Sequence, residues 1–288
     1  MIKVNYVYVI TATILLALDF ALSKKYQAAE GVSLSAGLRF NALNGLFTAL
    51  MFFGFSGVEF SLFSALMAFA MSVCMASYSV IGFRILKTGN MSVYSVFLMS
   101  GGMLLPYLFG VLFLQEPLTV FRIAGVILIL LAVILSNGMK FQRNVSFVWL
   151  CVLIFVLNGF CSIISKCHQI NTSYASVNSM TFVAYTGLGR FLFSSVLLLC
   201  CKKGQKQQPV SLKRTVVLAV GSALIGGVSY GLQLMGAKEL PATVLYPLVT
   251  GGSIVFSAFS GMIFFREKLS RRQIISIILC VAGTLLFL

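Results

Sequence analysis

Apolar residues fill this chain in ten runs of 17 to 24 positions, and a short polar connector separates each run from the next. A helix needs about 20 mainly apolar residues to cross a bilayer. The connectors carry charged residues, Gly, Pro or Asn, which are turn signals. The pattern therefore predicts ten membrane-spanning helices, over residues 4–22, 36–56, 62–83, 91–114, 119–137, 147–165, 180–201, 214–236, 242–265 and 272–288.

Composition supports the same fold class. Hydrophobic residues make up 59% of the chain and charged residues only 9%, and the mean hydropathy is +1.02. Soluble domains contain about 25% charged residues, so a fold in water could not cover this much apolar surface. We expect an all-α integral membrane protein embedded in the lipid bilayer.

The net charge of +15 would suggest a nucleic-acid partner if the protein were soluble. Here the basic residues lie in the connectors, where they orient helices in a membrane, and they form no groove with interleaved aromatic residues. The seven cysteines lack C-x-x-C spacing, and His168 is the single histidine. We expect no nucleic-acid partner, no metal site and no cofactor.

One stretch occurs twice. "GVLFLQEPLTVFRIAGVILILLAVILS" (110–136) and "GMIFFREKLSRRQIISIILCVAGTLLF" (261–287) share their register, 151 positions apart. Arg39 recurs as Arg190 at the same separation, and "LSKKYQ" at the end of the first run aligns with "ISKCHQ" at the end of the sixth at a separation of 142. We infer two five-helix repeats, over residues 1–140 and 141–288.

Five crossings are an odd number, which fixes the relation between the repeats. The second copy enters the membrane from the opposite side, so the two repeats are inverted about an axis in the membrane plane. That arrangement recurs in secondary transporters, where the two halves open a central site alternately to each side. The geometry alone therefore favours transport.

The duplicated motif resembles a known family. The pattern G-x-x-F-x-x-E-x-L-[TS] is formed by Gly110, Phe113, Glu116, Leu118 and Thr119, and again by Gly261, Phe264, Glu267, Leu269 and Ser270. In both copies it is similar to the EamA-type repeat of the drug/metabolite transporter superfamily. Lys24 and Lys166 match the family's first-helix lysine, although the tryptophan of that pattern is missing from both copies. The resemblance implies a ten-helix carrier of small metabolites or drugs.

Asp19 is the only acidic residue well inside an apolar run, in "ILLALDFALSK". Ionisable groups within spans are costly, so by default they mark a functional site. One interpretation is that Asp19 binds solute or couples transport to protons. The other is that its side chain reaches the membrane interface or pairs with Lys24.

Other polar or small residues lie within the first, third, fourth, sixth, eighth and ninth runs, the helices that line the central cavity in the family. With Asp19, the candidates for this cavity are Tyr78, Tyr94, Ser100, Gly101, Asn158, Tyr230, Gln233, Tyr246, Thr250 and Gly251. Pro247 loosens the ninth helix just before its glycine pair. A tyrosine-rich and nearly uncharged cavity would suit a neutral, zwitterionic or aromatic solute.

The remaining motif residues are expected to be structural. Glu116 and Glu267 precede helices beside Leu-Thr and Leu-Ser, and carboxylates stabilise helix N-termini. Arg39 and Arg190 are expected to brace or cap their helices. Lys24 and Lys166 complete this group.

Basic residues predict an orientation. Of the 21 Lys and Arg residues, fifteen lie in the first, third, fifth, seventh and ninth connectors, and four lie at the N-terminus or in the other connectors. The positive-inside rule places the fifteen in the cytoplasm and both termini outside the cell membrane. The family resemblance implies termini inside; we follow the charges.

The sequence predicts a secondary transporter and leaves one alternative open, a membrane channel or a non-transporting membrane component. An intramembrane hydrolase would need a Ser/His or paired-acid constellation, and one histidine with one embedded acid does not supply it. The chain has no P-loop for ATP hydrolysis. Coupling to a proton or to a counter-solute is left open.

Overall fold

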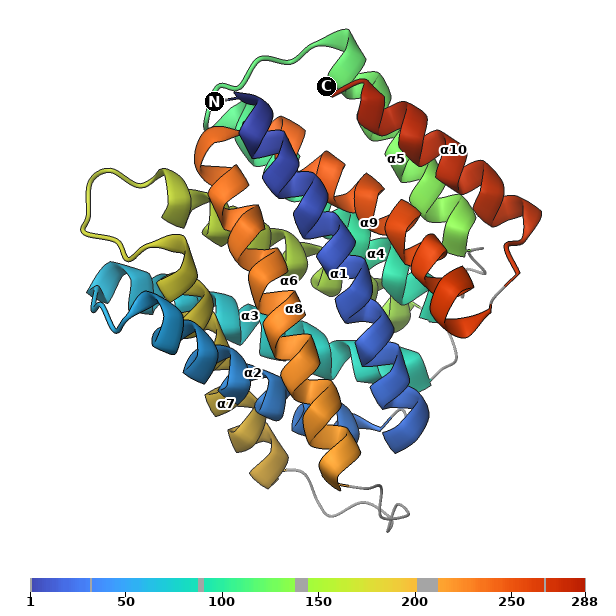
Figure 1. The fold of residues 1–288 in the computed structure, drawn as a ribbon. Helices are drawn as coiled ribbons and strands as arrows, with labels where there is room; N and C mark the ends of the chain where they lie inside the picture. Colours follow the sequence, from blue (N-terminus) through green and yellow to red (C-terminus); the bar gives the residue numbers. More distant parts are fainter. Residues whose placement is uncertain are drawn as a thin grey trace.

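The computed structural model describes residues 2–31, 33–87, 91–137, 145–200, 212–266 and 268–287. This part of the chain folds into ten α-helices and contains no strand (Figure 1). The helices are α1 (Ile2–Glu30), α2 (Leu34–Ser56), α3 (Leu62–Lys87), α4 (Met91–Leu112), α5 (Val120–Asn137), α6 (Val145–Ile170), α7 (Ser179–Cys200), α8 (Leu212–Glu239), α9 (Ala242–Phe265) and α10 (Arg271–Leu285).

The helix lengths match a membrane. Eight of the helices in the described ranges are long and apolar enough to span a bilayer, and α5 is a shorter apolar helix. Large apolar side chains stay exposed on the outer faces, such as Leu66, Leu199 and Ile278, where lipid would cover them. The expected all-α membrane fold is confirmed.

The first helix is longer than the sequence predicts. It continues past residue 22 to Glu30, because "KKYQAAE" consists mostly of good helix formers. It ends at Gly31, whose φ of 79° lies in the left-handed region. Lys24 and Lys25 therefore lie on α1 rather than in a connector, and Asp19 lies eleven residues before the helix end instead of three.

Helices α1 to α5 (the first unit) and α6 to α10 (the second unit) pack in a two-fold pattern. α1 contacts α8 and α9, and the equivalent helix α6 contacts α3 and α4. α2 packs against its equivalent α7, and α5 packs against α10. These are the pairs expected if the two predicted repeats are related by a two-fold axis. The predicted boundary at residues 140 and 141 lies outside the described residues.

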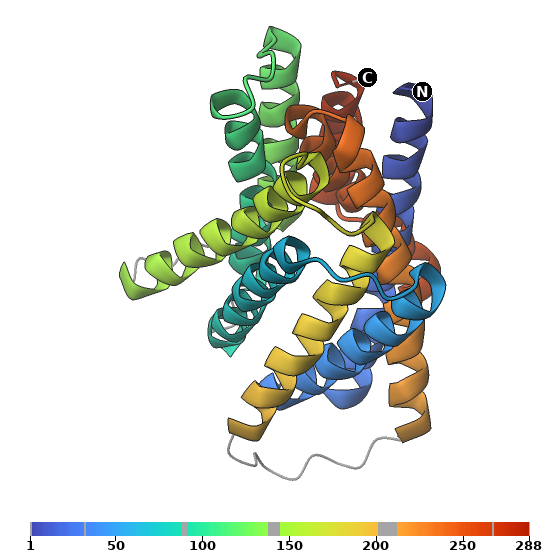
Figure 2. The same cartoon turned by 90° about the vertical axis from the view of Figure 1, so that its left-hand side faces the viewer.

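The two chain termini lie at the same end of the molecule, which we call the terminal end (Figures 1 and 2). In Figure 2, α1 runs away from this end, whereas α6 runs obliquely toward it. The α4–α5 connection lies at the terminal end, and α7 ends at the opposite end. The directions of α1 and α6 are those expected of inverted units.

Glycines bring equivalent helices into close contact at equivalent positions. A Cβ atom on Gly101 of α4 would lie 2.2 Å from the backbone oxygen of Phe155 in α6. In the other unit, a Cβ atom on Gly252 of α9 would lie 3.0 Å from Oγ1 of Thr13 in α1. Gly101 and Gly252 are 151 positions apart, and Thr13 and Phe155 are 142 apart, which are the separations of the sequence repeat.

Two buried apolar clusters hold the bundle together on either side of its centre. One cluster joins α4, α5, α9 and α10 to the first half of α1 and the end of α8. The other joins α2, α3, α6 and α7 to α8. A central cavity is lined by polar side chains together with members of both clusters, such as Val183 and Ile254.

The close approach of α4 and α6 predicts that Gly101→Ala destabilises the protein. The added methyl group would meet backbone that cannot move alone, and overpacking costs about 1–3 kcal/mol. We expect a lower midpoint of thermal unfolding in detergent. Gly54→Ala is the matched control, because nothing lies within 4 Å of its Cβ position; equal midpoints for the two variants would contradict the packing argument.

Candidate functional site

A cavity of about 740 Å³ lies at the centre of the bundle, between the two units. Many of its lining positions recur in the second unit at the separations of the sequence repeat. The equivalent pairs are Leu16 and Asn158, Phe20 and Ser162, Ser95 and Tyr246, Leu98 and Val249, Met99 and Thr250, and Gly102 and Ser253. Tyr78 and Tyr230, which also line the cavity, are 152 positions apart, one residue off this register. The cavity therefore follows the seam between the units.

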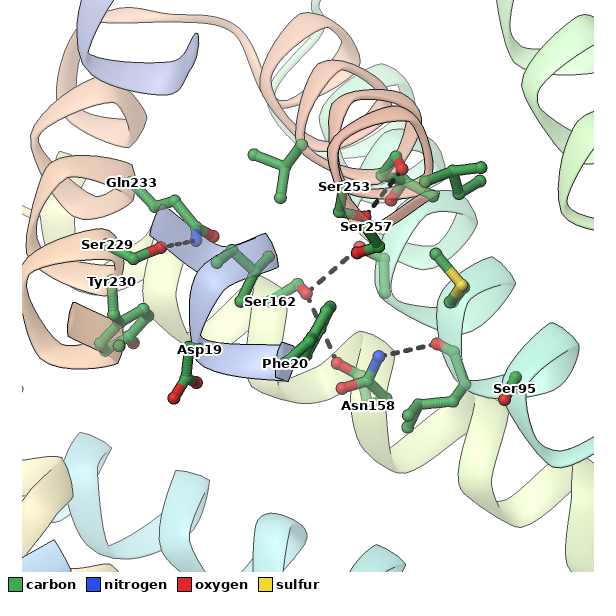
Figure 3. Close-up of a pocket in the computed structure, with 18 of the residues that line it drawn as sticks. Asp19, Phe20, Ser95, Asn158, Ser162, Ser229, Tyr230, Gln233, Ser253 and Ser257 are labelled. Atoms are coloured by element: carbon green, nitrogen blue, oxygen red, sulfur yellow. Dashed lines mark hydrogen bonds between the residues drawn. The ribbon is translucent and has the colours of Figure 1, made fainter. Parts of the chain in front are cut away.

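The cavity reaches toward the end of the molecule that lies opposite the terminal end. Its lining includes Ser95 near the start of α4, Ser136 at the end of α5 and Gln273 near the start of α10. Figure 3 shows Asp19 and Phe20 of α1 on one side of the cavity, with Asn158 of α6 and Ser95 of α4 farther across it.

The structure brings most of the expected cavity residues together. The candidates that line the cavity are Asp19, Tyr78, Asn158, Tyr230, Gln233, Tyr246 and Thr250. The other four, Tyr94, Ser100, Gly101 and Gly251, are not among its lining residues.

Packing explains the positions of three of those four. The ring of Tyr94 lies against Gly82 of α3, within 2.6 Å of the place a Cβ would occupy. Gly101 faces the backbone of α6, and Gly251 faces Thr284 and Ile129. Of the neighbouring glycines Gly101 and Gly102 on α4, Gly102 is the one that lines the cavity.

A chain of hydrogen bonds crosses the cavity wall and joins four helices from both units. The Arg190 guanidinium donates to Oδ1 of Asn44 at 2.6 Å. The Asn44 amide donates to the Ser222 hydroxyl at 2.9 Å, and that hydroxyl donates to the Asp19 carboxylate. We call these four residues the polar relay.

The polar relay changes two expectations. Arg190, for which the sequence suggests a bracing role, also lines the cavity, so the wall carries two opposite charges where we expected almost none. The partner of Asp19 is Ser222 rather than Lys24. Asn44 and Ser222 carry no motif that would single them out, because small polar residues are common within the spans.

Hydrogen bonds to the backbone fix the wall on the side of α4, α6 and α9. The Asn158 amide donates to the Leu98 carbonyl at 2.7 Å, and the Ser162 hydroxyl donates to the Gly102 carbonyl at 3.2 Å. The Tyr246 hydroxyl donates to the Ser162 carbonyl at 2.5 Å. These bonds link α6 to α4 of the first unit and to α9 of the second unit.

The motif glutamate of the first unit caps a helix of the second. Glu116 accepts hydrogen bonds from the backbone N–H groups of Ala242 and Thr243 and from the Thr243 hydroxyl, each at 2.7 Å. The first N–H groups of a helix have no partner within it, and a carboxylate there also favours the helix dipole. Glu116 thus connects the α4–α5 connection to the start of α9.

Lys166 supports the same junction from α6. Its side chain is only 4% exposed, and its ammonium donates to the carbonyls of Ala237 and Leu240 at 2.7 Å each. These carbonyls belong to the last turn of α8 and the residue beyond it. Glu116 and Lys166 together hold the α8–α9 junction at the terminal end.

The two copies of the motif share a turn conformation. Gln115 and Arg266, each directly before a motif glutamate, have left-handed φ values of 52° and 53°. Glu267 itself lies outside the described residues. Of the other expected structural residues, Lys24 places its ammonium 4.6 Å from the ring centre of Phe265, and Arg39 is exposed near the start of α2.

Comparison with known proteins gives a family and a fold. The model of the EamA-like transporter family matches residues 145–288, which is half of the chain. No curated protein sequence matches the chain significantly. A solved crystal structure is similar over 99% of this chain and 96% of its own, with a TM-score of 0.75 and 16% sequence identity. At that identity the likeness shows the fold alone.

The cap on α9 predicts that Glu116→Ala destabilises the bundle. Hydrogen bonds to a charged group contribute about 1.5–3 kcal/mol each, and loss of a helix cap costs about 0.5–2 kcal/mol. We expect a loss of about 2 kcal/mol, seen as a lower midpoint of thermal unfolding in detergent. Glu59→Ala removes an exposed carboxylate and serves as the control; if it lowers the midpoint equally, Glu116 has no special capping role.

Proposed function

The chain belongs to the EamA-like transporter family, and we propose on this premise that it is a secondary transporter of a small solute. The solute would bind in the central cavity between the two units. A channel or a non-transporting membrane component is the alternative. The family is one of transporters rather than enzymes, which fits the expectation that the chain catalyses no reaction.

The observation that supports this proposal best is the position of the cavity on the seam between equivalent helices. Both units contribute to it at equivalent positions, so movement of one unit against the other would change access from either end. Its volume of about 740 Å³ lies within the range of about 300–1,000 Å³ that is usual for small-molecule sites.

The contacts at the terminal end support a particular stage of the transport cycle. Glu116 and Lys166 hold the α8–α9 junction there, and the Tyr246–Ser162 hydrogen bond lies between the junction and the cavity centre. The cavity reaches the opposite end, where basic residues such as Lys25, Lys213 and Arg271 lie. In the proposed orientation that end faces the cytoplasm, and the structure corresponds to an inward-facing state of a cell-membrane carrier.

Counterflow in proteoliposomes tests the carrier mechanism. Liposomes would be loaded with unlabelled succinate, putrescine, phenylalanine or uridine, and the same solute would be added outside in labelled form. A carrier gives saturable uptake and transient accumulation of label above equilibrium for at least one solute, because exchange proceeds through a single alternating site. Uptake that rises linearly and shows no counterflow would indicate a channel.

Labelling with a membrane-impermeant maleimide tests the orientation. Lys213 is exposed at the start of α8, at the end of the molecule opposite the termini. In a variant without native cysteines, Lys213→Cys should remain unlabelled in intact cells and react after permeabilisation. Tyr174→Cys, exposed in the α6–α7 connection, should react in intact cells; the reverse result would place the termini inside.

A further inference from the structure

Asp19 and Arg190 are opposite charges on the wall of one cavity within the membrane span. The polar relay separates them by two neutral side chains, Asn44 and Ser222. Each bond in the relay has its donor on the Arg190 side and its acceptor on the Asp19 side. The relay therefore aligns its dipoles between the two charges, and hydrogen bonds in such chains strengthen one another.

The polar relay occupies only part of the hydrogen-bonding capacity of Asp19 and Arg190. A guanidinium carries five N–H donors, and a carboxylate has about four acceptor positions. Within the described residues, Arg190 donates one hydrogen bond and Asp19 accepts one. Both side chains line the cavity, so their remaining hydrogen-bonding capacity is available to a bound molecule.

The second carboxylate oxygen of Asp19 lies beside a glycine. A Cβ atom on Gly226 would lie 2.9 Å from Oδ2 of Asp19, so the absence of a side chain on Gly226 preserves the space next to this oxygen. Gly226 also lines the cavity. A donor group of a solute could approach the carboxylate there.

The charges break the two-fold symmetry of the cavity. By the separations of the repeat, Asp19 corresponds to Cys161 and Arg190 corresponds to Arg39, which is exposed near the start of α2 and is not among the lining residues. The Cys161 thiol makes only a weak contact, with the Met71 backbone carbonyl at 3.8 Å. One side of the seam thus places both charges on the cavity wall, whereas the equivalent positions, Cys161 and Arg39, place no charge there.

From this arrangement we propose that the cavity binds a zwitterionic solute, with its cationic group on Asp19 and its anionic group on Arg190. The proposal rests on the proposed transport function and names the class of solute. The two charges of one small head group would complete the hydrogen bonding of both side chains. The apolar remainder of the solute would extend toward Leu98, Met99 and Ile254, which line the cavity on α4 and α9.

A solute with one charge fits this wall less well. It would pair with one of the two side chains and leave the other facing a desolvated site without a counter-charge, which is costly. A wall with one charge of each sign therefore discriminates against simple cations and simple anions as well as attracting zwitterions.

A charge series of solutes tests the proposal. The probes are alanine, serine, leucine and phenylalanine as zwitterions, with their amides as cations and their N-acetyl derivatives as anions. Binding is measured in detergent by calorimetry on wild type, Asp19→Asn, Arg190→Gln and Gly226→Ala. Thermal unfolding without ligand shows whether each variant is folded.

For wild type, we expect at least one zwitterion to bind about tenfold or more tightly than its amide and its N-acetyl form, because losing one partner of a buried charge pair is costly. Asp19→Asn should remove the preference over the N-acetyl form, and Arg190→Gln should remove the preference over the amide. Gly226→Ala should weaken the zwitterion and the amide but not the N-acetyl form. This crossed pattern does not arise if the variants only loosen the fold.

Three results would overturn the proposal: no zwitterion binds, the three charge forms bind equally, or both charge variants weaken all forms alike. Counterflow with the same probes separates this inference from the transport function. Counterflow without charge preference would retain the carrier and reject the zwitterion site. The crossed binding pattern without counterflow would retain the site and reject the carrier.

Discussion

The bilayer imposes one constraint on which the rest of this structure depends: its interior has no water to satisfy polar groups, so each must find a partner within the protein. Among the described residues, only Tyr107 and Ser257 have a buried side-chain oxygen without a hydrogen bond. The most costly groups are the helix ends and the ionisable side chains. Glu116 satisfies the start of α9 across the seam, and Asp19 and Arg190 find partners across it in Ser222 and Asn44. The same bonds that make the fold stable therefore also hold the two units together.

Glu116 and Lys166 illustrate how this works at the terminal end. One residue satisfies the N–H groups that begin α9, and the other satisfies the carbonyls that end α8. Each belongs to a different unit, so the α8–α9 junction has a support from either side. Any rearrangement that opens this end must replace these bonds, which makes them a natural barrier between two states of a carrier.

Symmetry and its local loss have separate consequences in the cavity. Equivalent glycines on α4 and α9 allow equivalent close contacts, and equivalent lining positions place the cavity on the seam. The polar relay has no equivalent, because Asp19 corresponds to Cys161, and Arg39, the counterpart of Arg190, is not among the lining residues. The duplicated parts provide the geometry for movement, whereas the unique parts give the wall its chemical character.

By itself, the sequence determined the all-α membrane fold, the ten helices and the duplicated turn, because lipid selects apolar runs of a definite length and the repeat preserves its register. It also indicated seven of the lining residues, since these lie on the helices that line the cavity in the family it resembles. The tertiary structure alone decided the partners: that Asp19 meets Ser222 rather than Lys24, that Arg190 joins the cavity wall, and that Glu116 caps a helix of the other unit. Those contacts join residues more than 100 positions apart, and hydrophobic periodicity carries no information about which distant polar groups will meet once the units pack.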